Sequence, residues 1–177
     1  LDTKIMIFCI FLVGFDILLG FTGYLSFGHA AFFGIAAYST GLMLKNFSDN
    51  IIPAIIVAVI AATLVAIVIG LLTLKRTGIY FSILTLAFAE MFHSMAMAML
   101  QTWTGGENGL TGMPTPMLFD IKMQGSAVFY FTAIMAIILF YVAKRIERSP
   151  VGLMMKAIKC NQTRLEYTGI NARKYKL

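Results

Sequence analysis

Charged side chains are scarce in this sequence of 177 residues. They make up 12% of the chain, whereas 59% of the residues are hydrophobic. Soluble domains contain about 25% charged residues, so this composition excludes an ordinary soluble domain, and we expect no nucleic acid among the partners. The composition instead predicts an all-α integral membrane protein.

Cysteines are few, and nucleotide-binding motifs are missing. The two cysteines, Cys9 and Cys160, lie in an apolar run and in a polar segment, so we expect no disulfide between them. The sequence contains no Walker-type phosphate loop. If the protein does work that is driven by ATP, partner subunits would therefore bind the ATP and its Mg²⁺. We expect neither a bound cofactor nor enzymatic activity in this chain itself.

A metal site is not expected either. Glu90 and His93 are three residues apart and share a helix face, as in the Glu-x-x-His motif of di-iron bundles. Such bundles need a second copy of the motif and further glutamates, and this sequence has neither.

Apolar runs divide most of the chain into candidate spans. A transmembrane helix needs about 20 apolar residues, and the third and fourth runs have that length. We predict a transmembrane region over residues 1–143, with spans at roughly 5–21, 29–44, 51–74, 79–100 and 127–143. Because the sequence begins without a methionine and ends without a stop-like tail, we expect a fragment of a longer protein.

The orientation in the membrane follows from the basic residues. Residues 144–177 carry nine basic and two acidic side chains, a net +7 against +6 for the whole chain. Lys and Arg concentrate in cytoplasmic loops, so this segment is predicted to be a basic cytoplasmic loop. The Lys75-Arg76 turn would lie on the same side, and residues 45–50 and 101–126 on the outer side.

The basic segment also has a helical pattern. Ser149-Pro150 predicts an N-cap followed by proline at the first helical position. Apolar residues then recur at helical spacing, and Gly169 predicts the helix end. The resulting amphipathic helix would either lie on lipid headgroups or dock on a soluble partner. Its apolar face is narrow and lacks Trp and Phe, which favours the docking role. The residues assigned to coupling with an ATPase are Ser149, Pro150, Gly152, Met155, Ile158, Leu165 and Gly169.

The joint between the first two runs, residues 20–34, is rich in glycine and almost free of charge. Irregular backbone at membrane depth is tolerated only where protein or a water cavity satisfies its amides, and transporters use interrupted helices of this kind at substrate sites. The alternative is a tight helical hairpin whose glycines allow close packing.

Polar side chains within the runs mark candidates for a substrate pathway. Asp16 and Glu90 are ionisable groups within predicted spans, where such groups are costly and usually functional. They either line the pathway or lock helices together through buried hydrogen bonds. The substrate-pathway candidates are Asp16, Ser26, His29, Thr85, Glu90 and His93.

The outer loop at residues 101–126 is dense in Gly, Pro, Thr and Asn, which are turn formers. Its length exceeds that of a hairpin. We expect a structured cap, a dock for an external protein, or an ordered loop without function.

Four stretches together resemble a known family. They read GFTGYLSFGHAAFFGIAAY, GIYFSILTLAFAEM, TGGENGLTGMPTP and SPVGLMMKAIKCNQTRLEYTGINARKYKL. In this order they resemble permease subunits of branched-chain amino-acid ABC importers, of the Liv-type M subunit. Departures from the family pattern are Tyr24 for a usual Gln, Asp16 for Asn, Leu153 for Arg and Cys160 for an acid.

The resemblance implies a multi-span permease in the inner membrane of a bacterium or archaeon. It implies as partners a second homologous permease, two cytoplasmic ATPase subunits and a periplasmic or extracellular substrate-binding protein. It also implies that residues 149–169 dock on an ATPase and that further spans follow residue 177. Urea or short-amide importers have related permeases, so those substrates stay open. The rival class is an ion-coupled secondary carrier with Asp16, Glu90 and His93 as proton relays.

Overall fold

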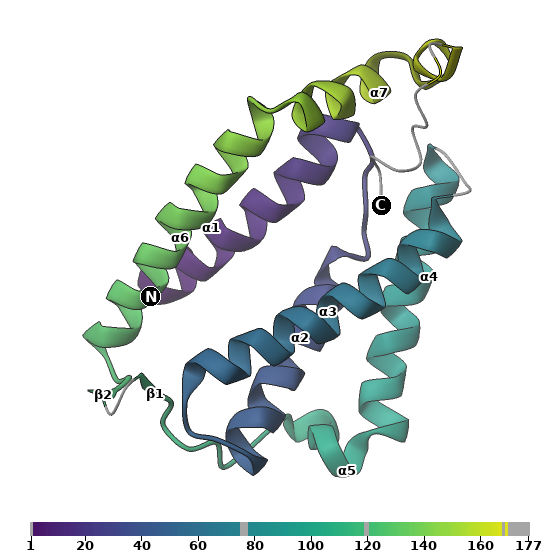
Figure 1. The fold of residues 1–177 in the computed structure, drawn as a ribbon. Helices are drawn as coiled ribbons and strands as arrows, with labels where there is room; N and C mark the ends of the chain where they lie inside the picture. The colour runs from purple at the N-terminus through teal and green to yellow at the C-terminus, as the bar shows by residue number, and fades with distance from the viewer. Residues whose placement is uncertain (1, 75–77, 119–120, 168, 170–177) are drawn as a thin grey trace. The chain divides into compact units, whose positions relative to one another are not determined.

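The fold is almost entirely helical (Figure 1). The structure, a computed structural model, describes residues 2–74, 78–118, 121–167 and 169. The elements in chain order are α1 (Asp2–Asp16), η1 (Ile17–Phe21), α2 (His29–Asn46), α3 (Ile51–Thr73), α4 (Ile79–Ser94), η2 (Met95–Met99), α5 (Gln101–Thr104), η3 (Gly106–Asn108), β1 (Met117–Leu118), β2 (Ile121–Lys122), α6 (Ser126–Glu147) and α7 (Pro150–Tyr167). The prediction of an all-α membrane protein is confirmed, with one short antiparallel strand pair added within residues 101–126.

Two of these elements are π-helical turns. η1 continues α1, and η2 continues α4. Such turns are rare and are frequent at functional sites. Neither was predicted from the sequence.

Four helices in the described part of the chain are long and apolar enough to cross a membrane. They are Asp2–Phe21, Ile51–Thr73, Ile79–Met99 and Ser126–Glu147. The second predicted span, residues 29–44, forms the helix α2 but is not among these four. His29, Lys45 and Asn46 lower the mean hydropathy of α2. The five-span arrangement therefore stays a prediction.

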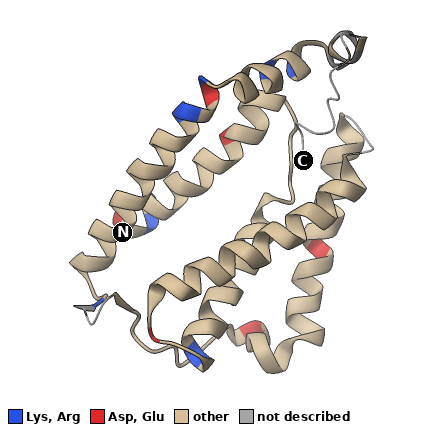
Figure 2. Ribbon diagram, in the orientation of Figure 1, with Lys and Arg blue, Asp and Glu red and all other residues tan. Residues whose placement is uncertain are grey.

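The chain forms two compact units. Unit 1 consists of Leu1–Ser26, Thr73–Ser82 and Gly125–Leu177, and unit 2 consists of Phe27–Leu72 and Ile83–Gln124. Figure 2 shows that Lys and Arg gather where α6 meets α7 and along α7, while the long helices carry few charges. The predicted basic turn Lys75-Arg76 and the basic residues beyond Gly169 lie outside the described residues.

In unit 1, α1 and α6 pack side by side and run parallel (Figure 1). Near the end of this pair, Asp16 lies over Gly20 of η1. A Cβ atom at Gly20 would be 2.6 Å from the Asp16 Oδ1 atom. The helix then ends, and α7 lies against η1.

The predicted interruption of the glycine-rich segment is present. Residues 23–28 are not helical, and Gly23 has a left-handed φ of 74°. The Ser82 hydroxyl donates a 2.6 Å hydrogen bond to the Leu25 carbonyl, and the Tyr24 ring meets the Phe81 ring edge-on at 5.1 Å. Side chains from the start of α4 thus contact this irregular backbone.

In unit 2, close contacts hold together the helices and the two loops predicted to lie outside. A Cβ atom at Gly28 would lie 2.7 Å from the Thr85 carbonyl oxygen, so α2 begins directly against α4. The Met117 amide donates a 2.7 Å hydrogen bond to the Asp49 carbonyl. The two loops predicted to share the outer side, residues 45–50 and 101–126, are therefore in contact.

Candidate functional site

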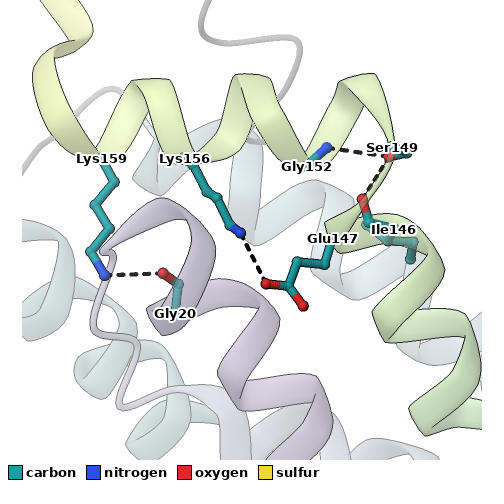
Figure 3. A network of polar contacts seen from close by, with 7 residues as sticks. All are labelled: Gly20, Ile146, Glu147, Ser149, Gly152, Lys156 and Lys159. Carbon is teal, nitrogen blue, oxygen red and sulfur yellow. Dashed lines mark hydrogen bonds and ion pairs between the residues drawn. The ribbon is translucent and has the colours of Figure 1, made fainter.

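The start of α7 is built by a cap. The Ser149 hydroxyl accepts a 3.3 Å hydrogen bond from the Gly152 amide and donates one of 2.6 Å to the Ile146 carbonyl (Figure 3). Pro150 is the first helical residue. The predicted N-cap and N-terminal proline are thus confirmed. A Cβ atom at Gly152 would lie 2.6 Å from the Glu147 carbonyl oxygen, so the tight turn from α6 into α7 requires glycine there.

The inner face of α7 packs on unit 1. Ile158 is only 4% exposed, and Met155 is half-buried. The Lys159 ammonium donates a 3.0 Å hydrogen bond to the Gly20 carbonyl of η1 (Figure 3). Carbonyls in the last turn of a helix have no intrahelical partner, and a cation there also complements the helix dipole. This contact therefore ties α7 to the end of the first span.

Lys156 makes a second set of contacts between α7 and the helices α6 and η1. Its ammonium lies 2.9 Å from Glu147 Oε1 and 5.7 Å from the centroid of the Phe21 ring. The hydrogen bond and the positive charge of Lys156 hold the pKa of Glu147 below its usual value. Glu147 lies past residue 143, where the predicted span ends. Because both side chains are partly exposed, the ion pair itself adds little stability.

The outer face of α7 is open. Leu153 is 65% exposed, Val151 is 43% exposed, and Cys160 is also exposed. Of the residues assigned to coupling from the sequence, Gly152 and Ile158 are buried against their own unit. They anchor the helix, and the outward surface includes Leu153 and Cys160.

The helix α7 is kinked at Asn161, which has φ −163° and ψ 97°. Leu165 follows this kink, so it does not continue the regular helical spacing of the apolar residues before Asn161. Gly169 has a left-handed φ of 84°, two residues after the last helical residue. The predicted glycine stop at the helix end is thus confirmed.

A cavity of about 580 Å³, called the α2–α4 cavity below, lies within unit 2. Most of its walls are apolar. Glu90 and His93 of α4 line it, and so do Tyr38 and Ser39 of α2. The remaining lining residues are Ala30, Ala31, Gly34, Ile35, Leu42, Val65, Ala89, Phe92, Met95, Ala96, Leu100, Trp103 and Thr104.

Tyr38, Ser39 and Thr104 were not predicted from the sequence. The adjacent hydroxyls of Tyr38 and Ser39 in an apolar run were the available signal. The Thr104 hydroxyl is already engaged: it lies 2.6 Å from the Ala96 carbonyl in η2 and 3.0 Å from the Leu100 carbonyl.

The structure does not bring all pathway candidates together. Glu90 and His93 share the α2–α4 cavity, whereas Asp16 lines a separate cavity of about 260 Å³ in unit 1 with Lys144 and Glu147. The remaining three lie elsewhere. Ser26 and Thr85 are each 3% exposed, and the His29 ring meets that of Phe32 at 6.3 Å.

No group of three or more His, Cys, Asp and Glu side chains able to hold a metal ion occurs within the residues that the structure describes.

The apolar helices and the interrupted first span define a multi-span helical membrane protein. The chain belongs to the family described as "Branched-chain amino acid transport system / permease component", whose family model matches residues 2–177. It is 24% identical to the high-affinity branched-chain amino acid transport system permease protein LivM of Escherichia coli (strain K12), and 23% identical to LivM of Salmonella typhimurium (strain LT2).

Both of these alignments extend over 199 positions. Each covers 99% of this chain and 47% of the relative. The chain therefore spans about half the length of the curated relatives it matches. No solved structure matches it.

Proposed function

We propose that this chain forms part of the membrane permease of an ATP-driven importer of branched-chain or other small amino acids. The observation that carries the proposal is the family match, which runs unbroken from the first helix through α7. In this proposal the chain assembles in the inner membrane with a second homologous permease, two cytoplasmic ATPase subunits and an external substrate-binding protein. ATP and Mg²⁺ bind to the ATPase subunits, and residues 144–177 are cytoplasmic.

Within this assembly α7 is the element that an ATPase subunit contacts. Its outer face presents Leu153, which is 65% exposed, and its inner face is tied to η1 by Lys159. A displacement of α7 by the ATPase would therefore act directly on the end of the first span and on the irregular segment after it. ATP binding and hydrolysis would in this way open the pathway alternately to each side.

The test uses the full-length permease expressed with its partner subunits. Leu153→Asp places a charge on the outer face of α7 without entering the core. We expect at least a tenfold weaker retention of the ATPase subunits, which corresponds to about 1.4 kcal/mol, and a matching loss of leucine uptake. Phe47→Asp is the matched control, because it places the same charge on another exposed apolar residue in the predicted outer loop. Unchanged ATPase retention in Leu153→Asp would contradict the docking role.

An ion-coupled carrier is the second candidate, and one observation favours it: Glu90 and His93 line the same cavity. A carrier would purify without ATPase subunits, and its uptake would fail when the proton gradient collapses. The importer would purify with ATPase subunits and fail when ATP is depleted. Uptake of labelled leucine, isoleucine, valine and urea would separate the amino-acid importer from a urea or short-amide importer.

A further inference from the structure

We propose that the α2–α4 cavity is a binding site for a zwitterion with an apolar side chain, in which Glu90 binds the ammonium group and the Tyr38 and Ser39 hydroxyls bind the carboxylate. The inference deepens the proposed function and rests on it for the choice of substrate. It places the substrate within unit 2 and gives individual residues their roles.

The first argument is the position of Glu90. It lies near the middle of the Ile79–Met99 helix, one of the four that can cross a membrane. An ionised carboxylate at that depth is costly unless it faces a cavity or a counter-charge. Glu90 faces the α2–α4 cavity, and it makes no hydrogen bond or ion pair with any residue in the described part of the chain. An ammonium group that enters the cavity would form a charge-assisted hydrogen bond with it.

The second argument is the presence of donors on another helix. Tyr38 and Ser39 belong to α2, whereas Glu90 belongs to α4. A hydroxyl can donate to a carboxylate, and neither of these two has a hydrogen-bond partner among the described residues. Thr104 is different, because it already contacts the Ala96 carbonyl. The cavity thus offers an acid on one helix and two donors on another, which suits a zwitterion better than a simple amine.

The third argument is the character and size of the remaining wall. Ile35, Leu42, Val65, Phe92 and Leu100 supply large apolar side chains. A volume of about 580 Å³ lies in the range of small-molecule sites, about 300–1,000 Å³. Such a wall favours an aliphatic side chain and disfavours a polar one, because a polar group there would lose its hydrogen bonds to water.

The experiment measures binding on the full-length permease with its ATPase subunits but without the external substrate-binding protein, and measures transport on the complete assembly. Thermal unfolding is followed with leucine, with 4-methylpentanoate, which lacks the ammonium group, and with 3-methylbutylamine, which lacks the carboxylate. We expect leucine to raise the melting temperature of the unsubstituted protein and the two analogues to leave it unchanged. Glu90→Gln should abolish the leucine effect and raise the KM for leucine uptake more than tenfold, and Tyr38→Phe should raise the KM by a smaller factor.

Glu107→Gln is the matched control, since Glu107 is an exposed acid of the outer loop that does not line the cavity. It should keep the leucine effect and the KM of the unsubstituted protein. The inference is overturned if leucine stabilises Glu90→Gln as much as the unsubstituted protein. It is also overturned if Glu90→Gln lowers the melting temperature without ligand but keeps the leucine shift, since Glu90 would then pair with another part of the assembly. Failure of the unsubstituted protein to import amino acids would contradict the proposed function, while the melting-temperature shifts would still decide the binding site.

Discussion

The Lys159 ammonium donates a 3.0 Å hydrogen bond to the carbonyl oxygen of Gly20, a residue 139 positions earlier in the chain. The contact joins the basic helix α7 to η1, the π-helical turn that ends the first span. Gly23 follows closely, and a Cβ atom there would lie 2.9 Å from the Lys159 Cγ atom. The backbone after the first span thus packs directly against the stem of the lysine side chain.

Replacement of this lysine should loosen α7. Lys159→Met keeps the apolar stem but removes the donor, so the Gly20 carbonyl loses its partner. We expect a loss of about 1 kcal/mol, the usual net contribution of one hydrogen bond, and therefore roughly fivefold faster hydrogen exchange of α7 amides. Lys45→Met, at the exposed end of α2, is the control and should leave that exchange unchanged. Equal exchange rates in Lys159→Met and the unsubstituted protein would show that the contact does not hold the helix.

The cap at the start of α7 gives a second prediction. Ser149→Ala removes the hydroxyl that accepts from the Gly152 amide, and loss of such a cap costs about 1 kcal/mol. Ser149→Asp restores an acceptor at the same place and should recover most of that loss. Limited proteolysis within residues 150–167 measures the effect. If Ser149→Asp is cut as fast as Ser149→Ala, the cap is not what fixes the helix start.

The ion pair between Lys156 and Glu147 gives a pH dependence. The pKa of Glu147 is lowered in the folded protein by the Lys156 hydrogen bond, so the stabilisation is complete above the unfolded pKa of about 4.3. It is lost as pH falls through the lowered folded value. A spin label on Cys160, in a Cys9→Ser background, should become slightly more mobile in that acid range, since an exposed ion pair contributes little.

Glu147→Gln serves as the control for this titration. It lacks the carboxylate, so the small gain in label mobility should already be present at neutral pH, and acidification should change the mobility little. A mobility curve identical to that of the protein with Glu147 would assign the transition to another group.

Two glycines of unit 2 give an opposed pair of predictions. A Cβ atom at Gly28 would lie 2.7 Å from the Thr85 carbonyl oxygen, whereas nothing lies within 4 Å of one at Gly34. Gly28→Ala should therefore lower stability by about 1–3 kcal/mol through overpacking. Gly34→Ala should raise it by up to about 1 kcal/mol, because alanine favours the helix interior. The melting temperatures of the two variants should move in opposite directions, and a shared direction would contradict the close approach at Gly28.

Much of the helical arrangement could be predicted from composition and local signals. The apolar runs gave each long helix to within a few residues, and Ser149-Pro150 gave the start of α7. These features depend on residues that are close in the sequence, so hydropathy and capping preferences are enough to predict them. The interruption after Gly20 was one of two interpretations of the sequence, because an uncharged stretch with four glycines is typical of an interrupted helix or of a tight helical hairpin.

The remaining features depend on contacts between distant residues. Asn161 carries no local signal strong enough to predict a kink, and the π-helical turns have no sequence signature. The periodicity that predicted the apolar face of α7 could not reveal that Ile158 faces its own unit while Leu153 faces outward. The α2–α4 cavity is formed by residues from four helices, so Tyr38 and Glu90 could not be associated from their positions in the chain.

Unit 2 is nested inside unit 1 along the chain, since both of its segments lie between Ser26 and Gly125. A ribosome that makes the chain therefore delivers all of unit 2 before α6 exists. Because α1 packs on α6, the side of α1 that contacts α6 lacks this neighbour until synthesis passes Ser126. During that interval lipid or the insertion machinery has to shield this side of α1, and unit 2 can assemble first.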